Sequence, residues 1–118
     1  MNTKNYNRTI NRKLEFAKIY RIINFKNNKI YIGGTCARLL CIRMSKHRAN
    51  KESHLHRSIG DIKDCKIELL EEVVVNDIYE FRNIEREYIQ KAWASNEFEC
   101  INKNLPNNKI RRNIKNNS

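Results

Sequence analysis

Long apolar segments are absent from this 118-residue sequence. No apolar run approaches the roughly 20 residues that a membrane-spanning helix requires. The chain also shows no hydrophobic leader pattern and no C-terminal cysteine motif for lipid attachment. We therefore expect an intracellular protein with no membrane partner, and the length suits one compact domain with one active site.

Paired cysteines are absent as well. The four cysteines form no Cys-x-x-Cys motif and stand at Cys36, Cys41, Cys65 and Cys100. In a chain without a secretory leader, cysteines normally remain reduced thiols. We therefore expect no disulfide bonds.

Acidic residues are scarce in both outer parts of the chain. Residues 1–51 carry thirteen lysines or arginines against one acid, Glu15, and residues 103–118 carry five against none. The middle, residues 52–102, carries six against twelve. The net charge of +11 and the pI of about 9.8 indicate a polyanionic partner, and nucleic acid is the first candidate.

Hydrophobic periodicity predicts an α+β domain. Residues of β-branched and aromatic type on either side of the polar segment 24–29 predict a β-hairpin, and Asn76 or Asp77 can cap a long helix. In chain order, the predicted elements are two strands, two helices, a strand and a helix, at residues 19–23, 30–33, 37–48, 54–62, 65–75 and 77–94.

Both ends of the chain are polar and basic, with little periodicity. We predict a flexible arm over residues 1–16, a folded domain over 17–105 and, from the helix-breaking Pro106, a flexible tail over 106–118. Basic residues of the domain and the tail are candidate nucleic-acid contacts. They are Lys46, Arg48, Lys103, Lys109, Arg111 and Arg112.

The predicted hairpin carries a tyrosine on each strand. Tyr20 follows Lys18-Ile19, and Tyr31 precedes Ile32-Gly33. Paired strands bring these tyrosines close together if the register allows it. The alternative is that both are ordinary strand aromatics that pack on the core.

Arg43 and His47 are four residues apart on a predicted helix, so they share one face. Leu40 and Met44 lie on the same face, which indicates that at least one of the two polar side chains is only partly solvated. The alternative is a solvated basic face.

Glu85 falls on the apolar stripe of the long C-terminal helix. That stripe consists of Ile78, Phe81, Tyr88, Ile89 and Ala92. An ionised carboxylate there costs several kcal/mol unless an arginine or a metal ion compensates its charge. Glu87 lies on the opposite, polar face of the same helix.

The order of these features resembles the GIY-YIG nuclease family over about residues 17–105. The matching segments are KIYRI, NNKIYIGGT, RMSKH, HLHRS, IELLEE, IEREYI and INKN. The resemblance implies a small domain with a central three-stranded antiparallel sheet flanked by helices. It also implies an endonuclease that hydrolyses DNA.

The resemblance assigns roles by position. Tyr20 and Tyr31 match the two signature tyrosines, Arg43 the helix arginine, His47 the residue one turn later, Glu85 the metal-binding glutamate and Asn102 a late asparagine that supports the site. There are two departures. Lys18 stands where the first motif usually has glycine, and the long connection from Gly33 to the helix leaves Arg38 as an alternative to Arg43.

The resemblance further implies a one-metal mechanism with Mg²⁺ or Mn²⁺. One carboxylate, Glu85, is enough because Mg²⁺ commonly keeps water ligands and takes substrate phosphate oxygens. Arg43 would neutralise charge on a phosphoryl oxygen. Activation of the attacking water would fall to a tyrosine or to His47, and a tyrosine is the preferred interpretation.

Two other interpretations are open on the sequence alone. A zinc-containing nucleic-acid-binding module could use Cys36, Cys41, His47 and either His54 or His56, provided that the predicted helix is interrupted. A DNA-binding relative that has lost cleavage would keep the fold without the chemistry.

Overall fold

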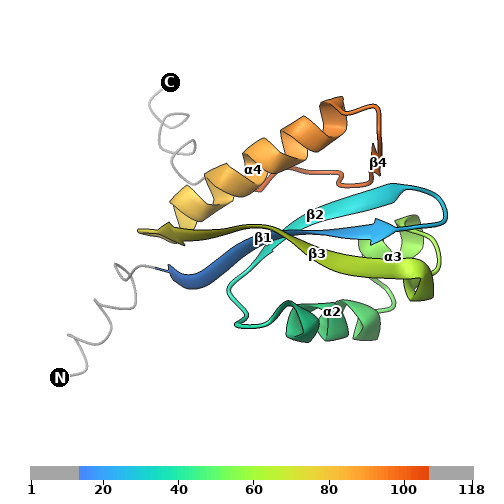
Figure 1. Cartoon of the computed structure of the whole chain (residues 1–118), viewed down its shortest axis with the longest axis horizontal. Coiled ribbons are helices and arrows are strands. Elements are labelled where there is room, and N and C mark those ends of the chain that lie inside the picture. Colours follow the sequence, from blue (N-terminus) through green and yellow to red (C-terminus); the bar gives the residue numbers. More distant parts are fainter. Residues whose placement is uncertain (1–13, 107–118) are drawn as a thin grey trace.

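The computed structural model describes residues 14–106 and shows helices on both sides of one sheet (Figure 1). The predicted arm and tail lie outside the described residues, apart from their innermost positions. The first strand begins at Leu14, three residues before the predicted start of the domain. In chain order, the elements are β1 (Leu14–Asn24), β2 (Lys29–Thr35), α2 (Leu40–Ala49), α3 (His54–Ser58), the 3-10 helix η1 (Ile62–Asp64), β3 (Cys65–Val75), α4 (Ile78–Ala94) and β4 (Glu99–Cys100).

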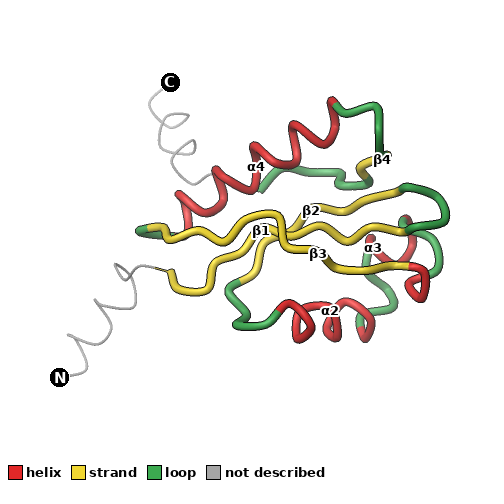
Figure 2. The backbone as a smooth tube through the Cα atoms, in the orientation of Figure 1, coloured by secondary structure: helices red, strands yellow, loops and turns green. Residues whose placement is uncertain are grey.

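The sheet has four strands in the order β3-β1-β2-β4 (Figure 2). β1 pairs antiparallel with β2 and with β3, whereas β4 runs parallel to β2. The predicted α+β class is therefore confirmed, but the predicted three-stranded antiparallel sheet is corrected to a four-stranded mixed sheet. β4, the strand that was not predicted, has only two residues. It pairs with residues 29–30, which are distant in sequence, so no local pattern predicts it.

The hairpin between β1 and β2 is closed by asparagines. The Asn24 side chain accepts hydrogen bonds from the backbone amides of Lys26 and Asn27, at 2.8 and 3.3 Å. Asn28 has φ +60°, a left-handed conformation that asparagine tolerates better than most residues. Local turn chemistry thus explains why the predicted hairpin forms at this place.

The two short helices differ from their predicted limits. α2 begins at Leu40 and not near 37, and its N-cap residue, Leu39, makes no side-chain capping bond. α3 ends at Ser58, because Gly60 has φ +93° and breaks the helix. A Cβ on Gly60 would also meet the side-chain nitrogens of Asn24 and Asn27, at 2.9 and 2.7 Å.

α4 agrees with the predicted helix. Asp77 is its N-cap and accepts a hydrogen bond from the Glu80 amide at 2.9 Å. Phe81, Ile89 and Ala92 of the predicted stripe are buried. Ile78 is an exception, because 37% of its surface is exposed at the first turn.

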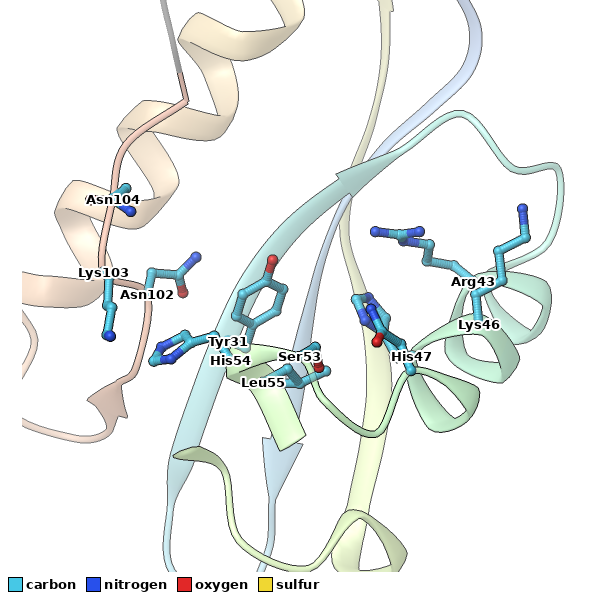
Figure 3. A pocket seen from close by; sticks show the side chains of 11 residues that line it. Tyr31, Arg43, Lys46, His47, Ser53, His54, Leu55, Asn102, Lys103 and Asn104 are labelled. Atoms are coloured by element: carbon cyan, nitrogen blue, oxygen red, sulfur yellow. The ribbon is translucent and has the colours of Figure 1, made fainter. Parts of the chain in front are cut away.

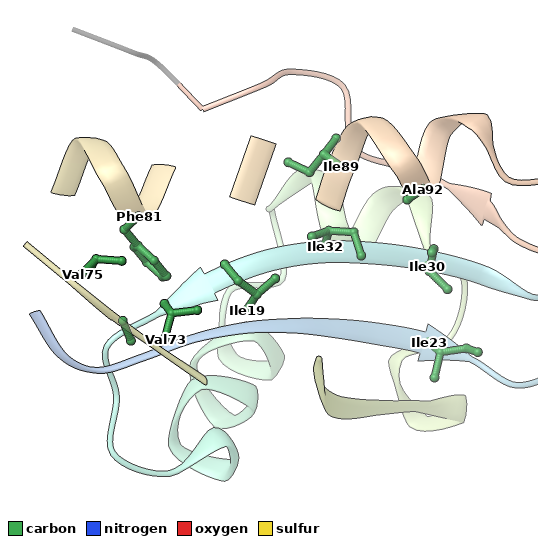
Figure 4. Packing of buried hydrophobic residues seen from close by; sticks show 10 residues of the cluster. Ile19, Ile23, Ile30, Ile32, Val73, Val75, Phe81, Ile89 and Ala92 are labelled. Atoms are coloured by element: carbon green, nitrogen blue, oxygen red, sulfur yellow. The ribbon is translucent and has the colours of Figure 1, made fainter. Parts of the chain in front are cut away.

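Each face of the sheet has its own hydrophobic core. α4 covers one face, and α2 and α3 cover the other (Figure 1). The α4 core, shown in Figure 4, consists of Ala17, Ile19, Ile23, Ile30, Ile32, Val73, Val75, Phe81, Ile89 and Ala92. The α2 core consists of Tyr20, Ile22, Met44, Leu55, Ile59 and Cys65. Alternation along β1 sends neighbouring residues to opposite cores.

Candidate active site

The two signature tyrosines lie on the same face of the hairpin. Tyr20 pairs with Gly33 across the strands, and Tyr31 pairs with Ile22. The tyrosines are therefore diagonal neighbours, two residues apart in register. Tyr20 is completely buried, whereas Tyr31 is half-buried.

Gly33 makes room for the Tyr20 ring. A Cβ at Gly33 would collide with the Tyr20 hydroxyl oxygen and would lie 2.9 Å from Cε1 of the ring. On the other face, a Cβ at Gly34 would lie 2.8 Å from Cζ of Phe81 and 2.9 Å from Oε1 of Glu85. The glycine pair thus lets an aromatic ring approach one face of β2 while α4 approaches the other.

Arg43 and His47 both reach Tyr20 from α2. The Tyr20 hydroxyl lies 2.7 Å from Nε2 of His47 and accepts a hydrogen bond of 3.3 Å from Nε of Arg43. The rings of both tyrosines meet the His47 imidazole edge to face, with centroids 5.9 Å apart in each case. Arg38, the alternative to Arg43, instead lies over the Phe16 ring.

Burial determines the protonation of this group. Desolvation, followed by the charge of Arg43 and then that of His56, lowers the pKa of His47 to about 4. Desolvation raises the pKa of Tyr20 to about 12, although the hydrogen bond from Arg43 acts against it. At neutral pH, Tyr20 is thus a phenol that accepts from Arg43 and shares a hydrogen bond with a neutral His47.

Glu85 approaches from α4 on the other side of the sheet. It is half-buried, and desolvation raises the pKa of its carboxyl, while Arg82 and then Arg43 lower it. Within residues 14–106 no hydrogen bond or ion pair engages this carboxylate, so the structural ion pair considered above is not formed there. Glu87 is exposed, which confirms the helical phase predicted for the two glutamates.

Asn102 supports the outer edge of β2. Its side-chain oxygen accepts a hydrogen bond from the Ile32 amide at 2.9 Å, and its side-chain nitrogen donates to the Ile32 carbonyl at 2.8 Å. The backbone carbonyl of Asn102 accepts a bond from Trp93 Nε1 at 2.9 Å. The Asn102 side-chain amide therefore satisfies both backbone groups of Ile32, as a neighbouring strand would, directly after Tyr31 in the chain.

A pocket of about 440 Å³ opens beside these residues (Figure 3). Tyr31, Arg43, His47 and Asn102 all line it. Of the predicted nucleic-acid contacts, Lys46 and Lys103 line the pocket as well, whereas Arg48 lines a separate hollow over β3. The other three, Lys109, Arg111 and Arg112, lie outside the described residues.

The zinc alternative finds no site in the described structure. Among residues 14–106, no three side chains of His, Cys, Asp or Glu gather closely enough to hold a metal ion. Nε2 of His54 donates to the Ile101 carbonyl and Nε2 of His56 donates to the His47 carbonyl, both at 2.7 Å. These two histidines therefore join segments of the fold.

Sequence reasoning missed part of the pocket lining. Asn50, Ser53 and Asn104 also line it, although they lie at helix ends and in a connecting segment where no periodic pattern marks them. His54, considered only as a zinc ligand, lines the pocket too. The double glycine at 33–34 was the one visible signal of the close approach made by Tyr20 and Glu85.

The fold and the candidate site belong to one small α+β domain. A family model described as the GIY-YIG catalytic domain matches residues 16–99, which is most of the chain. The chain therefore belongs to the GIY-YIG nuclease family, whose substrates are nucleic acids. Comparisons with curated proteins and with solved structures found no match. No helix within residues 14–106 has the length and apolar character needed to cross a membrane.

Proposed function

We propose that this chain is a metal-dependent endonuclease that hydrolyses DNA phosphodiester bonds. The observation that carries the proposal is the hydrogen-bonded group of Arg43, Tyr20 and His47, with Glu85 approaching the same end of β2 from α4. Phosphodiester hydrolysis requires a base for the attacking water and positive charge near the phosphoryl oxygens. Tyr20 and His47 supply the base, Arg43 supplies the positive charge, and Glu85 can hold a metal ion that adds to it.

Tyr20 and His47 together can act as the base. A phenol with a pKa of about 12 releases its proton reluctantly, so Tyr20 alone is a weak base at neutral pH. Its hydroxyl, however, lies 2.7 Å from Nε2 of a neutral His47. Substrate binding must bring a water to the Tyr20 oxygen, which is completely buried in the free chain. When that oxygen takes a proton from the water, its own proton passes to His47, and no free phenolate forms. The resulting hydroxide attacks phosphorus and the bond from phosphorus to the leaving oxygen breaks. The leaving oxygen takes a proton from a second water, and His47 returns its proton to the hydroxide left behind.

Arg43 serves both Tyr20 and the substrate. One of its nitrogens, Nε, fixes the Tyr20 hydroxyl, and the terminal nitrogens of the guanidinium are left for a phosphoryl oxygen. Arg43 also lines the pocket, so its charge is accessible to a ligand there. The Tyr31 hydroxyl has no hydrogen bond to any residue in 14–106, which leaves it available to hold the attacking water.

Glu85 suits a metal ion that needs one protein carboxylate. Its side chain is half-buried and unpaired within residues 14–106, and a divalent cation would offset the cost of its burial. Glu85 would hold Mg²⁺ or Mn²⁺, whose remaining ligands are water and substrate oxygens. When bound, the ion would polarise a phosphoryl oxygen and stabilise the charge that develops during hydrolysis.

Plasmid DNA incubated with the purified full chain tests this proposal. We expect nicking and linearisation with Mg²⁺ and none with excess chelator. Tyr20→Phe should lower the cleavage rate at least about 100-fold, because it removes the hydroxyl that relays the proton. Tyr79→Phe, which removes a tyrosine hydroxyl from the first turn of α4, is the matched control. DNA binding without cleavage in the parent chain would contradict the proposal and indicate a non-cleaving relative.

A further inference from the structure

The pocket beside Arg43 is larger than one phosphate group requires. Its volume is about 440 Å³, within the range of about 300 to 1,000 Å³ of sites for whole small molecules. Lys46 of α2 and Lys103 of the segment after β4 stand on opposite sides of it, with Tyr31 between them (Figure 3). None of its eleven described lining residues is acidic. The pocket therefore suits an anionic ligand that extends beyond the scissile phosphate.

Its polar groups fall into two sets. Asn102 and His54 use their side chains to hold the fold, through Ile32 and through the Ile101 carbonyl. The side chains of Asn50 and Asn104 form no hydrogen bond with any residue in 14–106, and both are exposed. These two amides and the two lysines therefore keep their donors and acceptors for a ligand.

The available groups match the parts of a nucleotide. Lysines bind phosphate as point charges. A side-chain amide presents a donor and an acceptor side by side, which is the pattern needed to pair with a base edge. The half-buried Tyr31 ring offers a flat surface on which a base can stack.

A base within a duplex exposes only its groove edges, because its faces are stacked between its neighbours and its pairing edge is bonded to the opposite strand, so it cannot stack on Tyr31 inside the pocket. We propose that the pocket receives one unpaired nucleotide adjoining the scissile phosphate, an inference that rests on the proposed nuclease function. Extruding a paired base costs a few kcal/mol, and a base that is already unpaired avoids this cost. The enzyme then prefers DNA with an unpaired nucleotide beside the cleavage position.

A set of synthetic duplexes tests this preference. Each carries one unpaired nucleotide, moved a single position at a time along a fixed sequence. Dissociation constants are measured by fluorescence anisotropy in chelator, and cleavage rates are measured separately with Mg²⁺. At one position next to the cut, we expect at least about fivefold tighter binding and faster cleavage than for the fully paired duplex. An abasic residue at that position should remove the gain, because the backbone remains flexible but the base is missing.

Two variants locate the preference in the pocket. Asn50→Ala and Asn104→Ala should each reduce the ratio of affinities for the unpaired and the paired DNA, whereas Asn76→Ala, at the turn before α4, should leave it unchanged. Equal affinities and rates for all duplexes, with cleavage intact, would overturn the inference and leave the nuclease proposal standing. A binding preference without any cleavage would support the pocket and contradict the nuclease proposal.

Discussion

The two faces of the sheet bury different kinds of side chain. All the core residues on the α4 face are apolar. The α2 face buries Tyr20 together with three polar or charged residues, Lys18, Asn24 and His47, and each of the four is hydrogen-bonded. One face thus supplies packing, and the other combines packing with the groups that can move a proton.

Glu85 is the exception that connects the two faces. It belongs to α4, yet Arg43 of α2 lowers the pKa of its carboxyl, and its own charge contributes to raising those of Tyr20 and Tyr31. Glu85 comes close to β2 at Gly34, where the strand presents no side chain to α4. The candidate catalytic side chains therefore gather where the glycine pair lets both faces approach one strand.

Alanine substitutions at Gly33 and Gly34 probe the two faces of the sheet in turn. We expect the larger effect at Gly33. Gly33→Ala forces the Tyr20 ring away from His47, and we expect cleavage to fall at least about 100-fold. Gly34→Ala displaces both Phe81 and the Glu85 carboxylate and should lower the free energy of unfolding by about 1 to 3 kcal/mol. Thermal melts and single-turnover rates measure the two effects separately. Parent-like cleavage by a folded Gly33→Ala variant would show that Tyr20 need not lie against β2.

Lowering the pH should reduce the free energy of unfolding through His47, which is buried on the α2 face. Its folded pKa of about 4 lies below the ordinary histidine value of 6.5, so the unfolded chain binds more protons between these values. Stability should therefore fall as the pH drops from 6.5 towards 4, by on the order of 3 kcal/mol from this residue.

His47→Gln removes the titrating group and should flatten that part of the curve. Urea unfolding of both chains across this pH range provides the measurement. Since His54 and His56 are present in both chains, the difference between the two curves isolates His47. Parallel curves would mean that the pKa of His47 is the same in the folded and unfolded chains, and would contradict this prediction.

The smallest effect is expected at the outer edge of β2. Asn102→Ala leaves the Ile32 amide and carbonyl without their partner, at a cost of about 1 kcal/mol because water can reach this half-buried edge. Hydrogen exchange at the Ile32 amide should accelerate, while Asn104→Ala should leave it unchanged. Unaltered protection in Asn102→Ala would show that the side-chain amide does not support the strand.

Local patterns predicted much of this fold. β3 spans residues 65–75 as expected from its β-branched composition, and α4 follows its Asp77 cap. The phase of α4 also separated Glu85 from Glu87 correctly. The sequence predicts the start of α2 too early because no capping side chain marks it. In the structure the Ala37 carbonyl belongs to the preceding loop, where it accepts a hydrogen bond from the Lys18 ammonium.

Long-range contacts could not be predicted in the same way. The bond from Tyr20 to His47 joins residues 27 positions apart, and the bonds from Asn102 to Ile32 join residues 70 apart. The family resemblance assigns these residues to one site. The hydrogen-bond partner of each polar atom, however, depends on the strand register and on how the segment after α4 returns to β2. The pocket lining at Asn50 and Asn104 has the same origin, because it lies between segments distant in sequence.

Mg²⁺-dependent cleavage by Glu85→Gln and Glu87→Gln tests the central claim most directly. Both substitutions keep the shape of the side chain and remove one charge from the same helix. Glu85→Gln should lower cleavage at least about 100-fold, while DNA binding is retained and thermal stability is unchanged or raised, because a half-buried charge is removed. Glu87→Gln should cut like the parent, because that side chain is exposed. An active Glu85→Gln beside an inactive Glu87→Gln would contradict the account and place the site on the other face of α4.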